Sequence, residues 1–181
     1  MKFHSQRCIT TKQGLTILKV NEISAKTYFV VPVQRVKDFI GRQEELRQIG
    51  SHFHQQSDRP RILVLHAMGG QGKSQIALEY CQQQRKIYSG IFWVNGSSKS
   101  TLTQGIISVG REINAATTDA LSNDDAKVAF TLRTLEEWEE RLLMVFDNCD
   151  DPTTFPDIEH FIPQGIPAAR ITCMNINFSR L

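Results

Sequence analysis

One stretch constrains the fold of this chain more than any other. It is a short apolar run that is followed by a glycine-rich turn and then by a helical pattern. Residues Ile62 to Leu65 are apolar, three glycines follow within the next seven residues, and Lys73 and Ser74 begin a helical pattern. Glycine lets backbone N–H groups converge on an anion, and a helix N-terminus offers unpaired N–H groups and partial positive charge. The order predicts a buried strand, a phosphate-binding loop and a helix.

The loop pattern also predicts roles for individual side chains. Lys73 would reach the β- and γ-phosphates of a nucleotide, and the Ser74 hydroxyl would ligate the accompanying Mg²⁺. The usual pattern G-x-x-x-x-G-K-[ST] starts with glycine, whereas this chain has alanine, which matters only if that residue needs a positive φ. An ordinary glycine-rich turn is the alternative. The residues predicted to hold the phosphates are Ala67, Met68, Gly69, Gly70, Gln71, Gly72, Lys73, Ser74 and Gln75.

A second apolar run, Leu142 to Phe146, ends in an acid, Asp147. A carboxylate at the end of a strand opposite the loop is expected to bind Mg²⁺ with Ser74, directly or through water, and Asp147 is also the candidate catalytic residue. Many nucleoside triphosphatases carry another acid next, but here the residue is Asn148, which cannot accept a proton as a carboxylate can. Asp150 or Asp151 is a candidate substitute, and the alternative is that Asp151-Pro152 only starts the following turn. We expect a slow ATPase at most.

The remaining pattern alternates strands and helices, which predicts an α/β fold with a mainly parallel sheet covered on both faces and a ligand at the carboxyl ends of the strands. On the helix after the loop, Ile76, Ala77, Tyr80 and Cys81 fall on one face. The other predicted segments are strands at 28–33, 91–94 and 168–174, helices at 42–55, 101–113 and 126–137, and a surface loop at 114–125.

Size and composition narrow the class of protein. The 181 residues suffice for one domain, and 21 Lys and Arg against 19 Asp and Glu favour neither nucleic acid nor an anionic membrane as partner. Four scattered cysteines argue against a zinc or disulfide framework, and no apolar run approaches a membrane span. We expect a cytoplasmic protein with a linker or poorly ordered segment at 1–27 and a nucleotide-binding domain at 28–181.

Five motifs in order carry a family resemblance: Phe29-Val-Val-Pro32, Asp38-Phe-Ile-Gly-Arg42, Met68 to Tyr80, Ile91-Phe-Trp-Val94 and Leu142 to Asn148. Together they resemble the NB-ARC domains of STAND signal-transducing ATPases, especially fungal members with tetratricopeptide repeats. The resemblance implies a P-loop NTPase three-layer sandwich in which the strand after Asp147 inserts between the Asp147 strand and the loop strand.

The resemblance also implies a ligand and a switch. Ile40, Gly41 and Arg42 would lie beside the adenine, ADP would hold a closed state, and exchange for ATP would drive oligomerisation. From the pattern alone, Phe39 to Arg42 fits either an apolar shelf for a purine or a helix start with a hydrophobic staple.

Two departures from the family pattern leave the function open. Thr172-Cys173-Met174 replaces the usual Thr-Ser-Arg, and a winged-helix region and repeats are not present, so we expect the domain to be incomplete at its C-terminus. The first hypothesis is an ADP/ATP-binding switch with Mg²⁺, the second a turning-over ATPase. The third is an inactive fragment that acts only through self-association or through a full-length NB-ARC relative.

Overall fold

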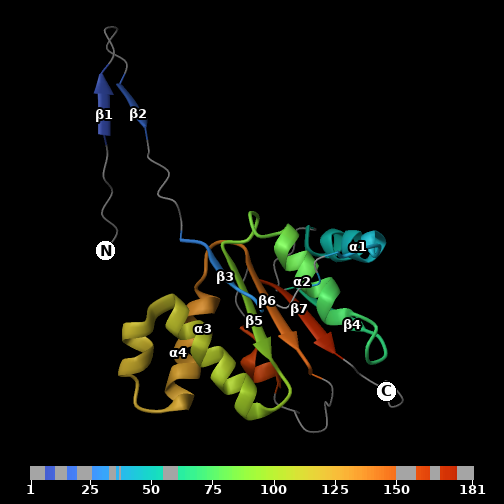
Figure 1. Ribbon diagram of the computed structural model, residues 1–181. Helices are drawn as coiled ribbons and strands as arrows, with labels where there is room; N and C mark the ends of the chain where they lie inside the picture. Colours follow the sequence, from blue (N-terminus) through green and yellow to red (C-terminus); the bar gives the residue numbers. More distant parts are fainter. Residues whose placement is uncertain are drawn as a thin grey trace.

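The computed structural model describes residues 7–10, 16–19, 26–32, 36, 38–54, 61–149, 158–163 and 168–174 (Figure 1). Its strands are β1 (Arg7–Thr10), β2 (Thr16–Lys19), β3 (Tyr28–Val30), β4 (Arg61–His66), β5 (Gly90–Asn95), β6 (Leu142–Asp147) and β7 (Ala168–Met174). Its helices are α1 (Gln43–His54), α2 (Lys73–Gln83), α3 (Lys99–Ala120), α4 (Asp124–Glu136) and the short 3-10 helix η1 (Ile158–Phe161).

Five strands form the main sheet in the order β3-β5-β6-β7-β4, and every neighbouring pair is parallel. The carboxyl ends of β5 and β6 lie side by side, because Asn95 pairs with Asp147. Strand β7 lies between β6 and β4, as the family resemblance implied. The α/β class and the mainly parallel sheet are confirmed.

Helices cover this sheet on both faces, which gives three layers (Figure 1). One core joins α1 and α2 to the sheet, with Phe53, Tyr80 and Val145 among its buried residues. The other joins α3 and α4 to the opposite face, with Ile106 and Phe146 among its members. Because β5 and β6 lie in the middle of both cores, their apolar runs are buried as predicted.

Strand β4 differs from its prediction as a buried strand. Leu63 and Leu65 pack against the core under α1 and α2, but Ile62 and Val64 are 49% and 42% exposed. The reason is the position of β4 at the end of the described sheet, where the described helices cover only one of its faces. The prediction of a buried strand was therefore wrong for the face that carries Ile62 and Val64.

The predicted surface loop at 114–125 was also wrong. Helix α3 continues to Ala120 through a break at Asn114, whose φ of −153° and ψ of 83° are not helical. The Asn114 side chain accepts a hydrogen bond from the Thr117 N–H at 3.1 Å, so it acts as a cap that starts the second helical piece. Helix α4 then begins at Asp124 after Asn123, which accepts a bond from the Ala126 N–H at 2.8 Å.

The first 27 residues contain a separate two-stranded sheet. β1 and β2 pair antiparallel, with Arg7 opposite Lys19 and Thr10 opposite Thr16. The sequence analysis predicted no regular structure for this segment. The division of the chain at residue 28 stays a prediction.

Candidate functional site

The turn after β4 has the backbone conformation that its glycines permit. Gly70 and Gly72 have φ values of +77° and +80°, in the left-handed region that side chains disfavour. Gly72 is the residue before α2 and provides no side-chain cap for that helix. The first N–H groups of α2, those of Lys73, Ser74 and Gln75, therefore lie at an uncapped helix start, which suits an anion.

The Lys73 ammonium group lies within the turn. Its Nζ donates hydrogen bonds to the carbonyl oxygen of Ala67 at 2.8 Å and to that of Met68 at 3.3 Å. A further bond from the Gln71 N–H to the Met68 carbonyl at 3.4 Å closes the turn. The positive charge is thus held where the sequence analysis expected phosphate oxygens.

The structure brings together the two residues predicted to bind Mg²⁺. The Ser74 hydroxyl donates to Oδ1 of Asp147 at 2.9 Å, and both side chains are partly buried. Ser74 lies in the first turn of α2 and Asp147 ends β6, so the carboxyl end of the sheet joins them. A hydroxyl and a carboxylate oxygen at this spacing fit Mg²⁺, which takes few protein ligands besides phosphates and water. Their role as metal ligands remains a prediction.

The segment between β3 and α1 crosses the loop and the start of α2. Arg42 donates from Nη2 to the Gln71 carbonyl at 3.4 Å and from Nη1 to Oε1 of Glu45 at 3.0 Å. The Val36 N–H donates to Oε1 of Gln75 at 3.0 Å, so the Gln75 side chain faces this segment. The bonds from Val36 and Arg42 thus connect the chain before α1 to the predicted phosphate loop.

Of the three residues predicted to contact adenine, only Arg42 lines a cavity. Gly41 and Arg42 have φ values of +80° and +59°, and the chain turns sharply there before α1. Ile40 is 88% exposed and does not line the cavity described next, and neither does Gly41. The Arg42 side chain does line it. Of the three predicted adenine contacts, one thus borders a cavity.

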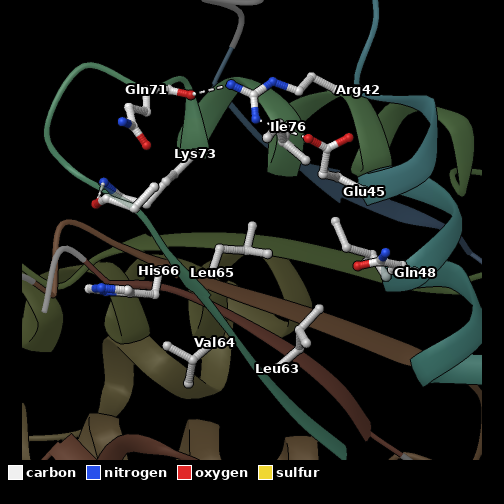
Figure 2. Close-up of a pocket in the computed structure, with 12 residues that line it drawn as sticks. Arg42, Glu45, Gln48, Leu63, Val64, Leu65, His66, Gln71, Lys73 and Ile76 are labelled. Atoms are coloured by element: carbon white, nitrogen blue, oxygen red, sulfur yellow. Dashed lines mark hydrogen bonds and ion pairs between the residues drawn. The ribbon is translucent and has the colours of Figure 1, made fainter. Parts of the chain in front are cut away.

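A cavity of about 290 Å³ lies between α1, β4 and the loop (Figure 2). Arg42, Glu45 and Gln48 form one wall, and the chain from Leu63 to Ala67 forms another. Arg42 and Glu45 form an ion pair on this wall, with Nη1 3.0 Å from Oε1. A backbone hydrogen bond to the Glu45 carboxyl and the bond from Arg42 together lower its pKa. The residues lining the cavity are Arg42, Glu45, Gln48, Ile49, Leu63, Val64, Leu65, His66, Ala67, Gln71, Lys73 and Ile76.

The sequence analysis did not predict Glu45, Gln48 and His66 as residues of this site. Glu45 and Gln48 are three apart on α1, a spacing that puts side chains on one helix face. That spacing could have indicated them, but nothing in the sequence showed that this face meets the loop.

The second candidate acid is not part of the described site. Asp150 lies outside the described residues. Asn148 directly follows Asp147, is exposed, and has a φ of +60°, a conformation that asparagine tolerates better than most residues. Within the described part of the chain, Asp147 is the one residue of the predicted catalytic pair.

Comparisons with known proteins point to a family. The model of the NB-ARC domain matches residues 42–173, more than half of the chain. A "Nucleotide-binding leucine-rich repeat (NLR)-like protein" from Hyaloscypha variabilis is 26% identical over 151 residues. That similarity covers 80% of this chain but only 14% of the relative's length. In the parts of the chain that the structure describes, no helix is long and apolar enough to span a membrane.

Proposed function

The chain belongs to the NB-ARC domain family, and we propose that it binds ADP or ATP with Mg²⁺ at the loop from Ala67 to Gln75. The observation that carries the proposal is the juxtaposition of this loop with an acidic strand end. Ser74 lies 2.9 Å from Asp147, directly beside the charged Lys73 and the uncapped start of α2. A cation, a metal-binding pair and a helix N-terminus at one point suit a magnesium-bound di- or triphosphate.

Each part of the nucleotide has a proposed partner. The phosphates would bind the N–H groups at the start of α2, and Lys73 would exchange the Ala67 and Met68 carbonyls for phosphate oxygens. Mg²⁺, when bound, would neutralise the phosphate charge between Ser74 and Asp147. The base would lie toward the cavity that Arg42 borders. Ile40 and Gly41, which do not line this cavity, would lie beside the base.

Titration calorimetry with ADP and ATP, with Mg²⁺ and with a chelator, tests the proposal. Lys73→Ala should weaken binding by about tenfold or more, because a hydrogen bond to a charged group contributes roughly 1.5–3 kcal/mol. Lys86→Ala, which removes an exposed lysine just beyond α2, is the matched control and should leave affinity unchanged. Equal affinities for the wild type and Lys73→Ala would contradict nucleotide binding at this loop.

We further propose that the bound nucleotide sets a signalling state. ADP would favour a closed monomer, and ATP would favour association of NB-ARC domains. The name of the fungal relative, a nucleotide-binding NLR-like protein, supports this role. Light scattering after gel filtration tests it: a larger mass with a non-hydrolysable ATP analogue than with ADP is expected, and identical masses would count against a switch.

Hydrolysis, if present, is proposed to be slow because of Asn148. Its amide stands where a second carboxylate would polarise the attacking water, and it is exposed beside Asp147. Phosphate release should therefore be weak in the wild type and absent in Asp147→Ala. Rapid turnover that survives Asp147→Ala would rule out this site as its source.

A second candidate function is contact with another NB-ARC chain. It is favoured by the exposed apolar face of β4, where Ile62 and Val64 are 49% and 42% exposed at the end of the described sheet. Ile62→Thr with Val64→Thr should abolish co-purification with a full-length relative or a second copy. A monomer that captures neither chain would exclude this function.

A further inference from the structure

We propose that Gly96 and Cys149 form a positioning pair that holds the Asp147 carboxylate against Ser74. The inference rests on the proposed function, in which Asp147 binds Mg²⁺. It assigns a role to two residues that do not line the cavity beside the loop. Both lie just beyond the carboxyl ends of neighbouring strands, Gly96 after β5 and Cys149 after β6.

The main chain of Asp147 is fixed from the side of β5. Asn95 and Asp147 are register partners at the ends of the two parallel strands. The next residue, Gly96, donates its N–H to the Asp147 carbonyl oxygen at 2.7 Å. Asn95 in turn accepts a bond from the Ser97 N–H at 2.9 Å, which closes the turn after β5. The Asp147 carbonyl therefore cannot rotate without breaking a short bond.

The Cys149 side chain lies near the same carbonyl oxygen of Asp147. Asn148 adopts a φ of +60°, so the chain reverses and brings the Cys149 sulfur over Gly96. The thiol is 6% exposed, packs in the core under α3, and lies 3.9 Å from the Asp147 carbonyl oxygen. Thus both residues contact the Asp147 carbonyl oxygen and hold the backbone that carries the Asp147 carboxylate.

Only glycine leaves room for this arrangement. A methyl group on Gly96 would overlap the Cys149 sulfur and would lie 3.4 Å from the Asp147 carbonyl oxygen. Gly96 does not have a positive φ, so alanine is excluded by packing and not by backbone conformation. Enlarging Gly96 must displace the Cys149 sulfur. Because Cys149 follows β6 by two residues, we expect the end of β6 and the carboxylate of Asp147 to move with it.

The experiment combines a disturbing variant, a compensating variant and a matched control. Gly96→Ala creates the overlap, and Gly96→Ala with Cys149→Ala relieves it, because the methyl at position 96 takes the space that the sulfur leaves. Cys149→Ala alone leaves that space empty and should also move Asp147. Gly90→Ala is the control, because Gly90 lies at the opposite end of the same two strands and its added methyl would meet Leu142 Cδ1 at 2.8 Å. It should disturb packing of β5 and β6 without moving Asp147.

The first readout is the affinity for ADP and ATP with Mg²⁺ relative to the affinity with a chelator. Gly96→Ala should reduce this ratio by about tenfold or more, in line with the effect of residues that orient metal ligands. The double variant should restore most of the ratio, and Gly90→Ala should leave it unchanged even if its melting temperature falls. An unchanged ratio in Gly96→Ala, or no restoration in the double variant, would overturn the proposal.

The second readout does not need nucleotide. The side-chain carboxyl carbon resonance of Asp147, assigned by its loss in Asp147→Asn, should shift both in Gly96→Ala and in Ser74→Ala. It should return in the double variant at positions 96 and 149. If the wild type binds no nucleotide but this resonance shifts and returns, the proposed function fails and the positioning pair stands. If Gly96→Ala does not fold, Cys149→Ala alone decides, and an unmoved resonance overturns the pair.

Discussion

The Ser74 hydroxyl and the Asp147 carboxylate are 2.9 Å apart although 73 positions separate them in the sequence. The sheet brings them together, because β4 leads into the loop before Ser74 while β6 ends at Asp147, and both strands run in the same direction. Parallel strands place their carboxyl ends at one edge, which is where ligands bind in such sheets.

If this pair binds Mg²⁺, Ser74→Ala and Asp147→Asn should act as a unit. Each variant removes one ligand and should weaken binding of ADP with Mg²⁺ but not binding with a chelator. The double variant should lose less than the sum of the two, with a coupling energy of about 0.5–3 kcal/mol. Titration calorimetry on the four proteins measures this coupling. Strictly additive losses would mean that the two residues act independently.

Alanine at two glycines should change stability in opposite directions. Gly41 has a φ of +80° and no atom within 4 Å of an added methyl, so alanine there should cost about 1–2 kcal/mol through backbone conformation alone. Gly50 lies inside α1, where an added methyl would only contact Tyr80 Cε2 at 4.0 Å. Gly50→Ala should raise the free energy of unfolding by about 0.5–1 kcal/mol. Urea unfolding provides both values, and equal signs would contradict the left-handed turn at Gly41.

Asn114 should contribute to stability as an internal cap of α3. Asn114→Ala removes the acceptor of the Thr117 N–H and should cost about 1 kcal/mol, whereas Asn114→Asp keeps an acceptor and should cost less. Ser108→Ala is the control, since Ser108 donates to the Gln104 carbonyl within the regular part of the same helix. Urea unfolding should separate the two sites. A loss for Ser108→Ala as large as that for Asn114→Ala would argue against a cap.

Alkaline pH should destabilise the core around Cys81. Burial raises the pKa of the Cys81 thiol from 9.0 to about 12, so the folded state favours the neutral form. The stabilisation is fully present below pH 9 and is lost as the pH rises from 9 toward 12, at up to about 1.4 kcal/mol per pH unit. Burial also raises the pKa values of Tyr80 and Tyr88, which adds to the loss at higher pH.

Cys81→Ala should flatten this pH dependence between 9 and 10, before the tyrosines contribute. The measurement is the free energy of unfolding in urea across that range. Cys149→Ala, which removes the other buried thiol in the described part of the chain, is measured for comparison. In the native wild type, a thiol reagent should modify Cys81 only after unfolding. Rapid modification of folded protein at neutral pH would refute the buried, protonated state.

Local signals predicted much of the fold. The glycines before Lys73 and the apolar runs of β5 and β6 predicted the loop and the central strands, since these features depend on neighbours in the sequence. The meeting of Ser74 and Asp147 was predicted from the loop motif and from the position of an acid at the end of a later parallel strand. The four residues of α2 predicted to face the core are buried: Ile76, Ala77, Tyr80 and Cys81.

The sequence could not predict features that depend on distant neighbours. The exposure of Ile62 and Val64 follows from the place of β4 at the end of the described sheet, which an apolar run does not reveal. The sequence did not predict the helix beyond Asn114, because a cap between two helical pieces has the same local pattern as the start of a loop. Likewise, no local pattern links Gly96 to Cys149, which meet only when β5 and β6 pair.

The sheet order also bears on the sequence of events during synthesis. Among the described strands, β4 pairs only with β7, so β4 can gain a neighbouring strand only after β7 has been synthesised. β5 and β6 can pair earlier, and β7 must then insert between β6 and β4. Closing so long a segment is slow. Pulse-labelled hydrogen exchange on a refolding chain should show protection in β5 and β6 before β4, and the phosphate loop should form last.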